Sequence, residues 1–140
     1  MSDKQLNKYL DESQHVGLVE SLSYIHKDLF ELENGQLDGF TLAYEAYGTL
    51  NEDGSNALLV CHALTGDHHA AGIRIDPRTE ELEQKPGWWN HVIGPEKAID
   101  TNRFYVVCSN CLGACQGSTG PASLKPDQEE ERYGMDFPEF

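Results

Sequence analysis

The chain has 140 residues, 39% of them hydrophobic, which is enough for a modest core in one domain or part of one. Its formal net charge is −14, with 10 Lys and Arg against 24 Asp and Glu. This balance argues against a nucleic-acid partner, because phosphate contacts need clustered basic residues. It also provides no steering of an anionic substrate, which would depend on a local pocket.

The sequence shows no sign of membrane insertion or secretion. No apolar run approaches the roughly 18 residues of a spanning helix. The opening MSDKQLNKYLDESQ is too polar for a secretory signal. We therefore expect a cytoplasmic protein with no membrane partner, in which the four cysteines are reduced thiols.

Residues 1–27 are predicted to be a polar lead-in, and residues 28–140 to form the domain. The domain begins with strands at Asp28–Glu33 and Gln36–Tyr47, because Asn34-Gly35 between them supplies the positive φ values of a tight hairpin. Alternate apolar residues predict the buried face of the second strand. They are Phe40, Leu42, Tyr44 and Ala46.

Two continuous apolar runs, Asn56–Leu64 and Phe104–Cys108, predict further strands, the first covered on both faces as in a parallel sheet. The long connection Thr65–Asp100 is irregular, with a short helix expected near Trp89–Ile93. Ligands bind at the carboxyl ends of parallel strands. The loops after both runs are therefore candidate sites.

The first candidate is the polar turn His62–Asp67. In α/β-hydrolase folds the loop after the third strand donates one backbone N–H to an oxyanion hole. An ordinary strand-ending turn is the alternative interpretation. The second candidate is the glycine-rich loop Asn110–Pro121, where Ser118 has Gln116 in place of the first glycine of G-x-S-x-G and lies too far beyond the strand to be a nucleophile.

Metal binding is the main rival chemistry. Cys108, Cys111 and Cys115 are spaced C-x₂-C-x₃-C, but this matches no four-ligand pattern, and Cys61 lies within a predicted strand. A metallohydrolase-type site remains an alternative, although its residues form neither H-x-H nor H-E-x-x-H. They are His62, Asp67, His68 and His69. We predict no metal, and a non-catalytic binding module is the other alternative.

Four stretches carry a resemblance to a known family. They are AYEAYGTLNEDGSNALLVCHALTGDHHAAG (Ala43–Gly72), PGWWNHVIGPEKAIDTNRFYVVCSN (Pro86–Asn110), LGACQGSTGPASLKP (Leu112–Pro126) and YGMDFP (Tyr133–Pro138). In order and spacing they resemble homoserine O-acetyltransferase, an acyl-CoA-dependent member of the α/β-hydrolase superfamily. The resemblance implies the α/β class, and within it the N-terminal part of an α/β-hydrolase fold with an incomplete sheet.

The resemblance also implies a ping-pong acyl transfer from acetyl-CoA, through a nucleophilic serine, to the hydroxyl of L-homoserine, in methionine biosynthesis. By position, the resemblance implies that the backbone N–H of Leu64 is an oxyanion donor. The residues implied to bind substrate lie in the same two loops. They are Ala63, Thr65, Gly66, Asn110, Gly113 and Gly117.

The resemblance implies no permanently bound cofactor, and a homodimeric full-length parent. The superfamily order is Ser, then Asp or Glu, then His, with the serine on an elbow after a later strand. The sequence stops at Phe140 before such an elbow, so we expect a fragment that lacks the triad and is inactive alone. Departures such as Glu96 and Cys111 leave open acetyl against succinyl donor and homoserine against serine acceptor.

Overall fold

The computed structural model describes residues 15–74, 86–126 and 128–138. Contacts divide the chain into two compact units. The first comprises Met1–Ser21 and Tyr44–Ser109, and the second comprises Leu22–Ala43 and Asn110–Phe140. Strand β3 (Gly35–Tyr47) contributes its end to the first unit and its beginning to the second.

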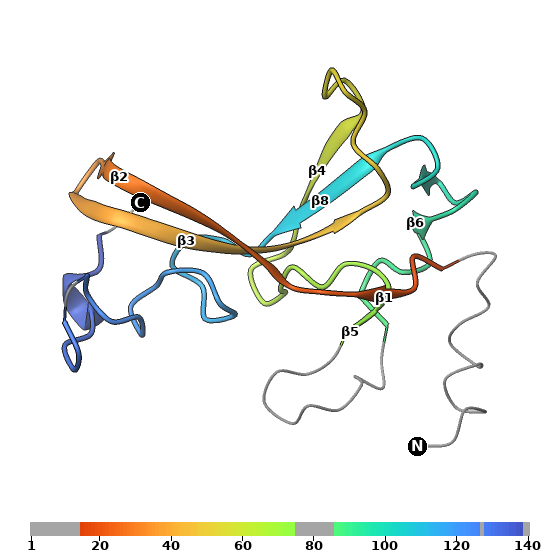
Figure 1. Cartoon of the computed structure of the whole chain (residues 1–140). Coiled ribbons are helices and arrows are strands. Elements are labelled where there is room, and N and C mark those ends of the chain that lie inside the picture. The colour runs from red at the N-terminus through yellow and green to blue at the C-terminus, as the bar shows by residue number, and fades with distance from the viewer. Residues whose placement is uncertain (1–14, 75–85, 127, 139–140) are drawn as a thin grey trace. The chain divides into compact units, whose positions relative to one another are not determined.

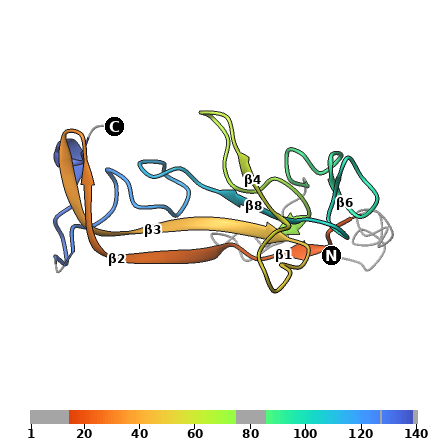
Figure 2. The same cartoon turned by 90° about the horizontal axis from the view of Figure 1, so that it is seen from above.

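The first unit is built on two parallel strands, β4 (Ala57–Cys61) and β8 (Tyr105–Ser109), which lie side by side in Figures 1 and 2. The end of β3 pairs with β8 in the antiparallel direction. Two short parallel pairs complete this unit. They are β1 (Leu18–Val19) with β5 (Ile73–Arg74), and β6 (Ile93–Gly94) with β7 (Ile99–Asp100).

The core of the first unit joins the central strands to the connection between them. Tyr47, Val60 and Val106 come from β3, β4 and β8, while Ala70 and Ala71 come from the loop after β4. All five are buried, so burial of apolar surface fixes this loop against the sheet.

The second unit contains the predicted hairpin, which Figure 1 shows as two long paired strands. Strand β2 (Leu22–Leu32) begins six residues before the predicted Asp28, inside the expected lead-in. The connecting turn is Glu33-Asn34, one residue earlier than expected, and Gly35 already belongs to β3. The C-terminal part of this unit includes a single 3₁₀ turn, η1 (Gly134–Asp136).

The predicted buried face of β3 is wrong. Phe40, Leu42, Tyr44 and Ala46 are only partly buried. The fully buried positions are Leu37, Ala43, Glu45 and Tyr47. A carboxylate occupies a core position here because Tyr47, His69 and Arg74 surround it with hydrogen-bonding or charged groups, which offset the cost of burying it.

The predicted cover on both faces of the strand at Asn56–Leu64 is also not observed. The strand is shorter, and Leu59 is 65% exposed while its neighbour Val60 is 4% exposed. Parallel strands are covered on both faces when helices pack against them. Within the described ranges the only helix is the three-residue η1, so one face of β4 has no helix above it.

The predicted helix near Trp89–Ile93 is replaced by consecutive turns. The N–H of Trp89 bonds to the carbonyl of Ala70 (2.7 Å), outside the segment, and the N–H groups of Val92 and Ile93 share the Trp89 carbonyl. The turns do not continue into a helix because Ile93 begins β6, which pairs with β7. In the described part of the chain, no helix combines the length and hydropathy required to span a membrane.

Candidate active site

The turn at the carboxyl end of β4 is tightly closed. The N–H of Gly66 bonds to the carbonyl of Ala63 (2.8 Å), which places Leu64 and Thr65 at the two central positions. The same carbonyl accepts a bond from His62 Nδ1 (2.7 Å). Four of the seven site residues predicted from sequence therefore lie in one β-turn of the first unit.

The N–H of Leu64 is not used by this turn, because the turn bond comes from Gly66. Among the described residues it has no hydrogen-bond partner. The Leu64 side chain is fully exposed, so the peptide lies at the surface of this unit rather than in packed interior. The geometry leaves this donor available to an external acceptor.

Asp67 anchors the turn on its far side. Its Oδ1 accepts the N–H of His69 (3.0 Å), its Oδ2 accepts Arg74 (2.9 Å), and its carbonyl accepts the Trp88 indole N–H (3.0 Å). Partial burial alone would raise the pKa of Asp67, but the His69 amide and the Arg74 guanidinium hold that pKa below its usual value. Asp67 is therefore an anionic anchor point at neutral pH.

A buried polar network lies behind this anchor. Glu45 is fully buried and accepts bonds from the Tyr47 hydroxyl (2.7 Å) and from His69 Nδ1 (3.0 Å), with Arg74 at 3.7 Å. Burial and the nearby Glu45 carboxylate raise the pKa of Tyr47, so its hydroxyl stays protonated and donates. The sequence interpretation missed this network. The signal that could have revealed it is Glu45, a charged residue that alternates with Ala43 and Tyr47 on the same face of β3.

His68 occupies a second buried position beside this network. Its Nε2 bonds to Ser21 Oγ (2.7 Å). Burial lowers the pKa of His68, because the charged imidazolium would lose solvation. In the neutral form, Nε2 either accepts the hydroxyl proton of Ser21 or donates its own proton to Oγ, according to the tautomer.

The glycine-rich loop belongs to the second unit, where it docks on the first part of β3. The N–H of Asn110 bonds to Ala43 (2.8 Å), and the N–H of Thr119 bonds to Thr41 (2.8 Å). Ser118 Oγ accepts the Ala43 N–H (3.1 Å) and donates to the Asn110 carbonyl (2.8 Å). Ser118 is 5% exposed and its hydroxyl is engaged on both sides, which gives this residue a structural role.

Gly113 and Gly117 shape this loop. Their φ angles are +86° and +100°, which glycine adopts readily and other residues rarely do. A Cβ on Gly117 would lie 3.0 Å from the Cβ of Ala43. Asn110 differs from both, because its side chain is fully buried while its amide nitrogen and oxygen have no partner among the described residues.

The described residues do not support the metal alternative. They contain no group of three His, Cys, Asp or Glu side chains placed to hold an ion. Of the four residues considered, His68 bonds to Ser21, His69 bonds to Glu45, and Asp67 pairs with Arg74. Cys108 is buried in β8, whereas Cys61, Cys111 and Cys115 are exposed.

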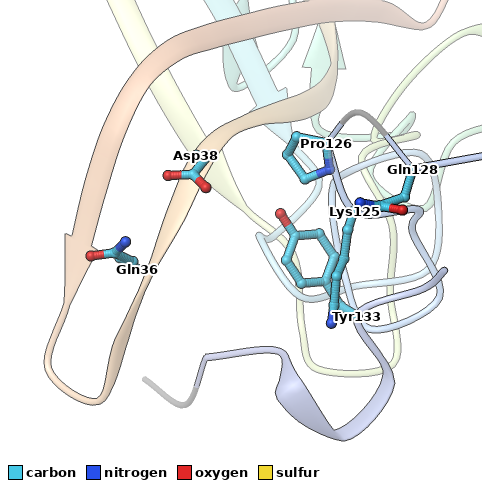
Figure 3. Close-up of a pocket in the computed structure, with 6 residues that line it drawn as sticks. All are labelled: Gln36, Asp38, Lys125, Pro126, Gln128 and Tyr133. Carbon is cyan, nitrogen blue, oxygen red and sulfur yellow. The ribbon is translucent and has the colours of Figure 1, made fainter.

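The second unit also has a pocket of about 440 Å³ that the sequence did not predict (Figure 3). Its lining is largely polar and comprises Gln36, Asp38, Lys125, Pro126, Gln128 and Tyr133. Lys125 already bonds to Glu131 (2.5 Å) and Asp136 (2.9 Å), which raises the pKa of Lys125 to about 12. Its charge is thus neutralised within the protein, and none of the predicted site residues lies here.

Comparison with known proteins shows which proteins contain segments similar to this chain. No protein-family model matches the chain. It is 53% identical over 124 residues to a homoserine O-acetyltransferase of Methanohalobium evestigatum, and 54% identical over 125 residues to a homoserine O-succinyltransferase of Acidithiobacillus ferrooxidans. The chain is homologous to part of the homoserine O-acyltransferases. These matches cover 88% of the chain, but only 24% and 31% of the two relatives.

Solved structures confirm the predicted α/β-hydrolase fold with an incomplete sheet. The homoserine O-acetyltransferase of Bacillus anthracis superposes with a TM-score of 0.73 at 38% identity, over 88% of the chain and 33% of that structure. Esterase E22 superposes with a TM-score of 0.72 at 38% identity, over 86% of the chain and 33% of that structure. The resemblance inferred from the four sequence stretches is therefore confirmed.

Proposed function

We propose that this chain supplies an oxyanion-stabilising turn and part of the substrate-binding wall of a homoserine O-acyltransferase. The observation that carries the proposal is the exposed, unpartnered N–H of Leu64 at the end of a parallel strand, within a segment 53% identical to a homoserine O-acetyltransferase. Backbone N–H groups in this position stabilise the charge that develops on an acyl carbonyl.

In the proposed reaction a serine hydroxyl attacks the thioester carbonyl of acyl-CoA and displaces the CoA thiol. The homoserine hydroxyl then takes the acyl group from the serine. Each step passes through a tetrahedral oxyanion, which accepts a bond from the Leu64 N–H. Serine, histidine and aspartate of the triad would come from outside these 140 residues, so we expect the chain alone to be inactive.

We propose acetyl-CoA as the donor and L-homoserine as the acceptor, placing the reaction in methionine biosynthesis in the cytoplasm. Relatives named homoserine O-acetyltransferase in both the sequence and the structure comparisons support this choice. Succinyl-CoA is the alternative donor, because relatives of equal identity are named succinyltransferases.

A segment exchange tests the donor. The chain would replace the matching segment in the Methanohalobium acetyltransferase and in the Acidithiobacillus succinyltransferase, with both parents as controls. We expect release of CoA thiol from acetyl-CoA in the presence of homoserine by both hybrids. A succinyl preference in either folded hybrid would contradict a donor choice carried by this segment, and folded hybrids without any acyl transfer would contradict the function.

Replacement of Leu64 by proline in an active hybrid tests the oxyanion donor. Proline is favoured at the first central position of a type I or type II turn and lacks the N–H. We expect kcat to fall about 10²–10³-fold, the usual effect of losing one such donor. Leu64→Ala, which keeps the N–H, should lose far less, and equal kcat values for the two variants would refute this role.

A further inference from the structure

We propose that Glu45 and Tyr47 are positioning residues that act at a distance on the turn Ala63–Gly66. The inference rests on the proposed function, because it assigns these residues to the geometry of the Leu64 donor. Neither residue belongs to the turn. They lie two positions apart on β3, and their side chains hold the chain immediately after it.

The first contact is made by the Tyr47 hydroxyl, which accepts the N–H groups of Ala70 (3.0 Å) and Ala71 (3.1 Å). Both alanines are fully buried. Without Tyr47 the Ala71 amide would lose its acceptor in the core, at a cost of about 1–3 kcal/mol, whereas the Ala70 amide would keep its bond to the His68 carbonyl (2.9 Å). The hydroxyl therefore fixes the path of the backbone a few residues beyond the turn.

The second contact runs from Glu45 to His69, three residues beyond the end of the turn. Glu45 accepts from His69 Nδ1, and the backbone N–H of His69 donates to Asp67 Oδ1. Arg74 bonds to Asp67 and lies 3.7 Å from Glu45. The side chains of these residues and of His69 thus form a closed ring of contacts. Asp67 belongs to this ring and directly follows Gly66. A shift of Glu45 or Tyr47 would therefore move the end of the turn.

The burial of Glu45 argues for a specific geometric role. Proteins in which well-packed apolar side chains replace a buried ionic group are often as stable as the original protein, or more stable. A carboxylate at position 45 orients its neighbours, because its two oxygens accept hydrogen bonds from the Tyr47 hydroxyl and from the His69 ring.

Hydrogen exchange on the 140-residue chain tests the inference without requiring activity. The variants are Tyr47→Phe, which removes the acceptor of two amides, and Glu45→Gln, which keeps the shape but removes the charge. Leu37→Ala is the matched control, a cavity variant at a 1% exposed residue of the second unit. We expect the hydrogen-bonded amides of this segment, those of Gly66, His69, Ala70, Ala71 and Gly72, to exchange about tenfold faster in the first two variants than in Leu37→Ala.

The same variants in an active segment-exchange hybrid separate positioning from folding. We expect Tyr47→Phe and Glu45→Gln to lower kcat about tenfold or more with less than about a twofold change in KM, because small misplacements near the reacting centre act on the transition state. Leu37→Ala should lower the melting temperature and leave kcat within about twofold.

Unchanged exchange at these hydrogen-bonded amides in both Tyr47→Phe and Glu45→Gln would overturn the inference, as would unchanged kcat. Should Tyr47→Phe fail to fold, Glu45→Gln decides the matter alone. Inactive wild-type hybrids whose chain still shows the expected exchange pattern would contradict the proposed function and not the mechanical coupling. The two failures are therefore distinguishable.

Discussion

Two glycines of the first unit have a positive φ but differ in the space around their Cα atoms. Gly48 follows β3 with a φ of +84°, and a Cβ there would lie 2.4 Å from the Phe104 carbonyl oxygen. Gly54 has a similar φ of +70°, but nothing lies within 4 Å of its virtual Cβ. The two glycines thus share a conformation and differ in their surroundings.

This difference predicts unequal effects of alanine. Gly54→Ala should cost about 1–2 kcal/mol, the strain of a left-handed residue. Gly48→Ala should cost more by at least about 1 kcal/mol, because the Phe104 backbone must also move. Urea unfolding followed by the fluorescence of Trp88 and Trp89 reports on this unit, and equal losses would show that the contact at Gly48 is relieved without cost.

The candidate site was only partly predictable at this scale. The residues of the turn after β4 were found from sequence because a polar, glycine-containing stretch follows an apolar run. Glu45 and Tyr47 were missed because their role depends on partners more than 20 positions away, namely His69, Ala70 and Ala71. No local pattern encodes such a contact.

At the scale of elements, the hairpin and both apolar strands were predictable, since turn chemistry and hydrophobic runs are local signals. The failures have a common cause. The predicted helix at Trp89–Ile93 is absent because Ile93 enters β6, which pairs with β7, and the buried face of β3 is shifted because Glu45 has distant partners. Tertiary hydrogen bonds decided both.

The edge of β4 gives a prediction at the scale of elements. Among the described strands β4 pairs only with β8, so one edge of an apolar strand is open, and Leu59 of the same strand is 65% exposed. Open apolar edges favour association, and lysine on an edge strand opposes it. We expect Leu59→Lys to slow aggregation of the chain, as measured by static light scattering at constant temperature.

Leu50→Lys is the matched control for this test. It changes the net charge equally, and Leu50 is 47% exposed but lies in the connector before β4. Charge alone would slow aggregation equally in both variants. A larger effect of Leu59→Lys therefore identifies the edge, whereas equal rates would assign the association to another surface.

At the scale of the whole molecule, the dominant feature is the net charge of −14. Such an excess makes the folded chain repel itself, and salt screens the repulsion. The buried pairs around Glu45 are less accessible to screening, so they should not reverse the trend. The free energy of unfolding should therefore rise with NaCl.

The form of that rise separates screening from other effects of salt. Because the Debye length is already about 10 Å at 0.1 M, most of the gain should come below that concentration. The double variant Glu129→Gln, Glu130→Gln removes two charges from an exposed acidic stretch and should raise stability at low salt while flattening the dependence. Urea unfolding at 20 mM and 500 mM NaCl measures both. A steady gain up to 500 mM, unchanged in the double variant, would mean that salt acts by exclusion from the protein surface, and that self-repulsion contributes little to the stability of this acidic chain.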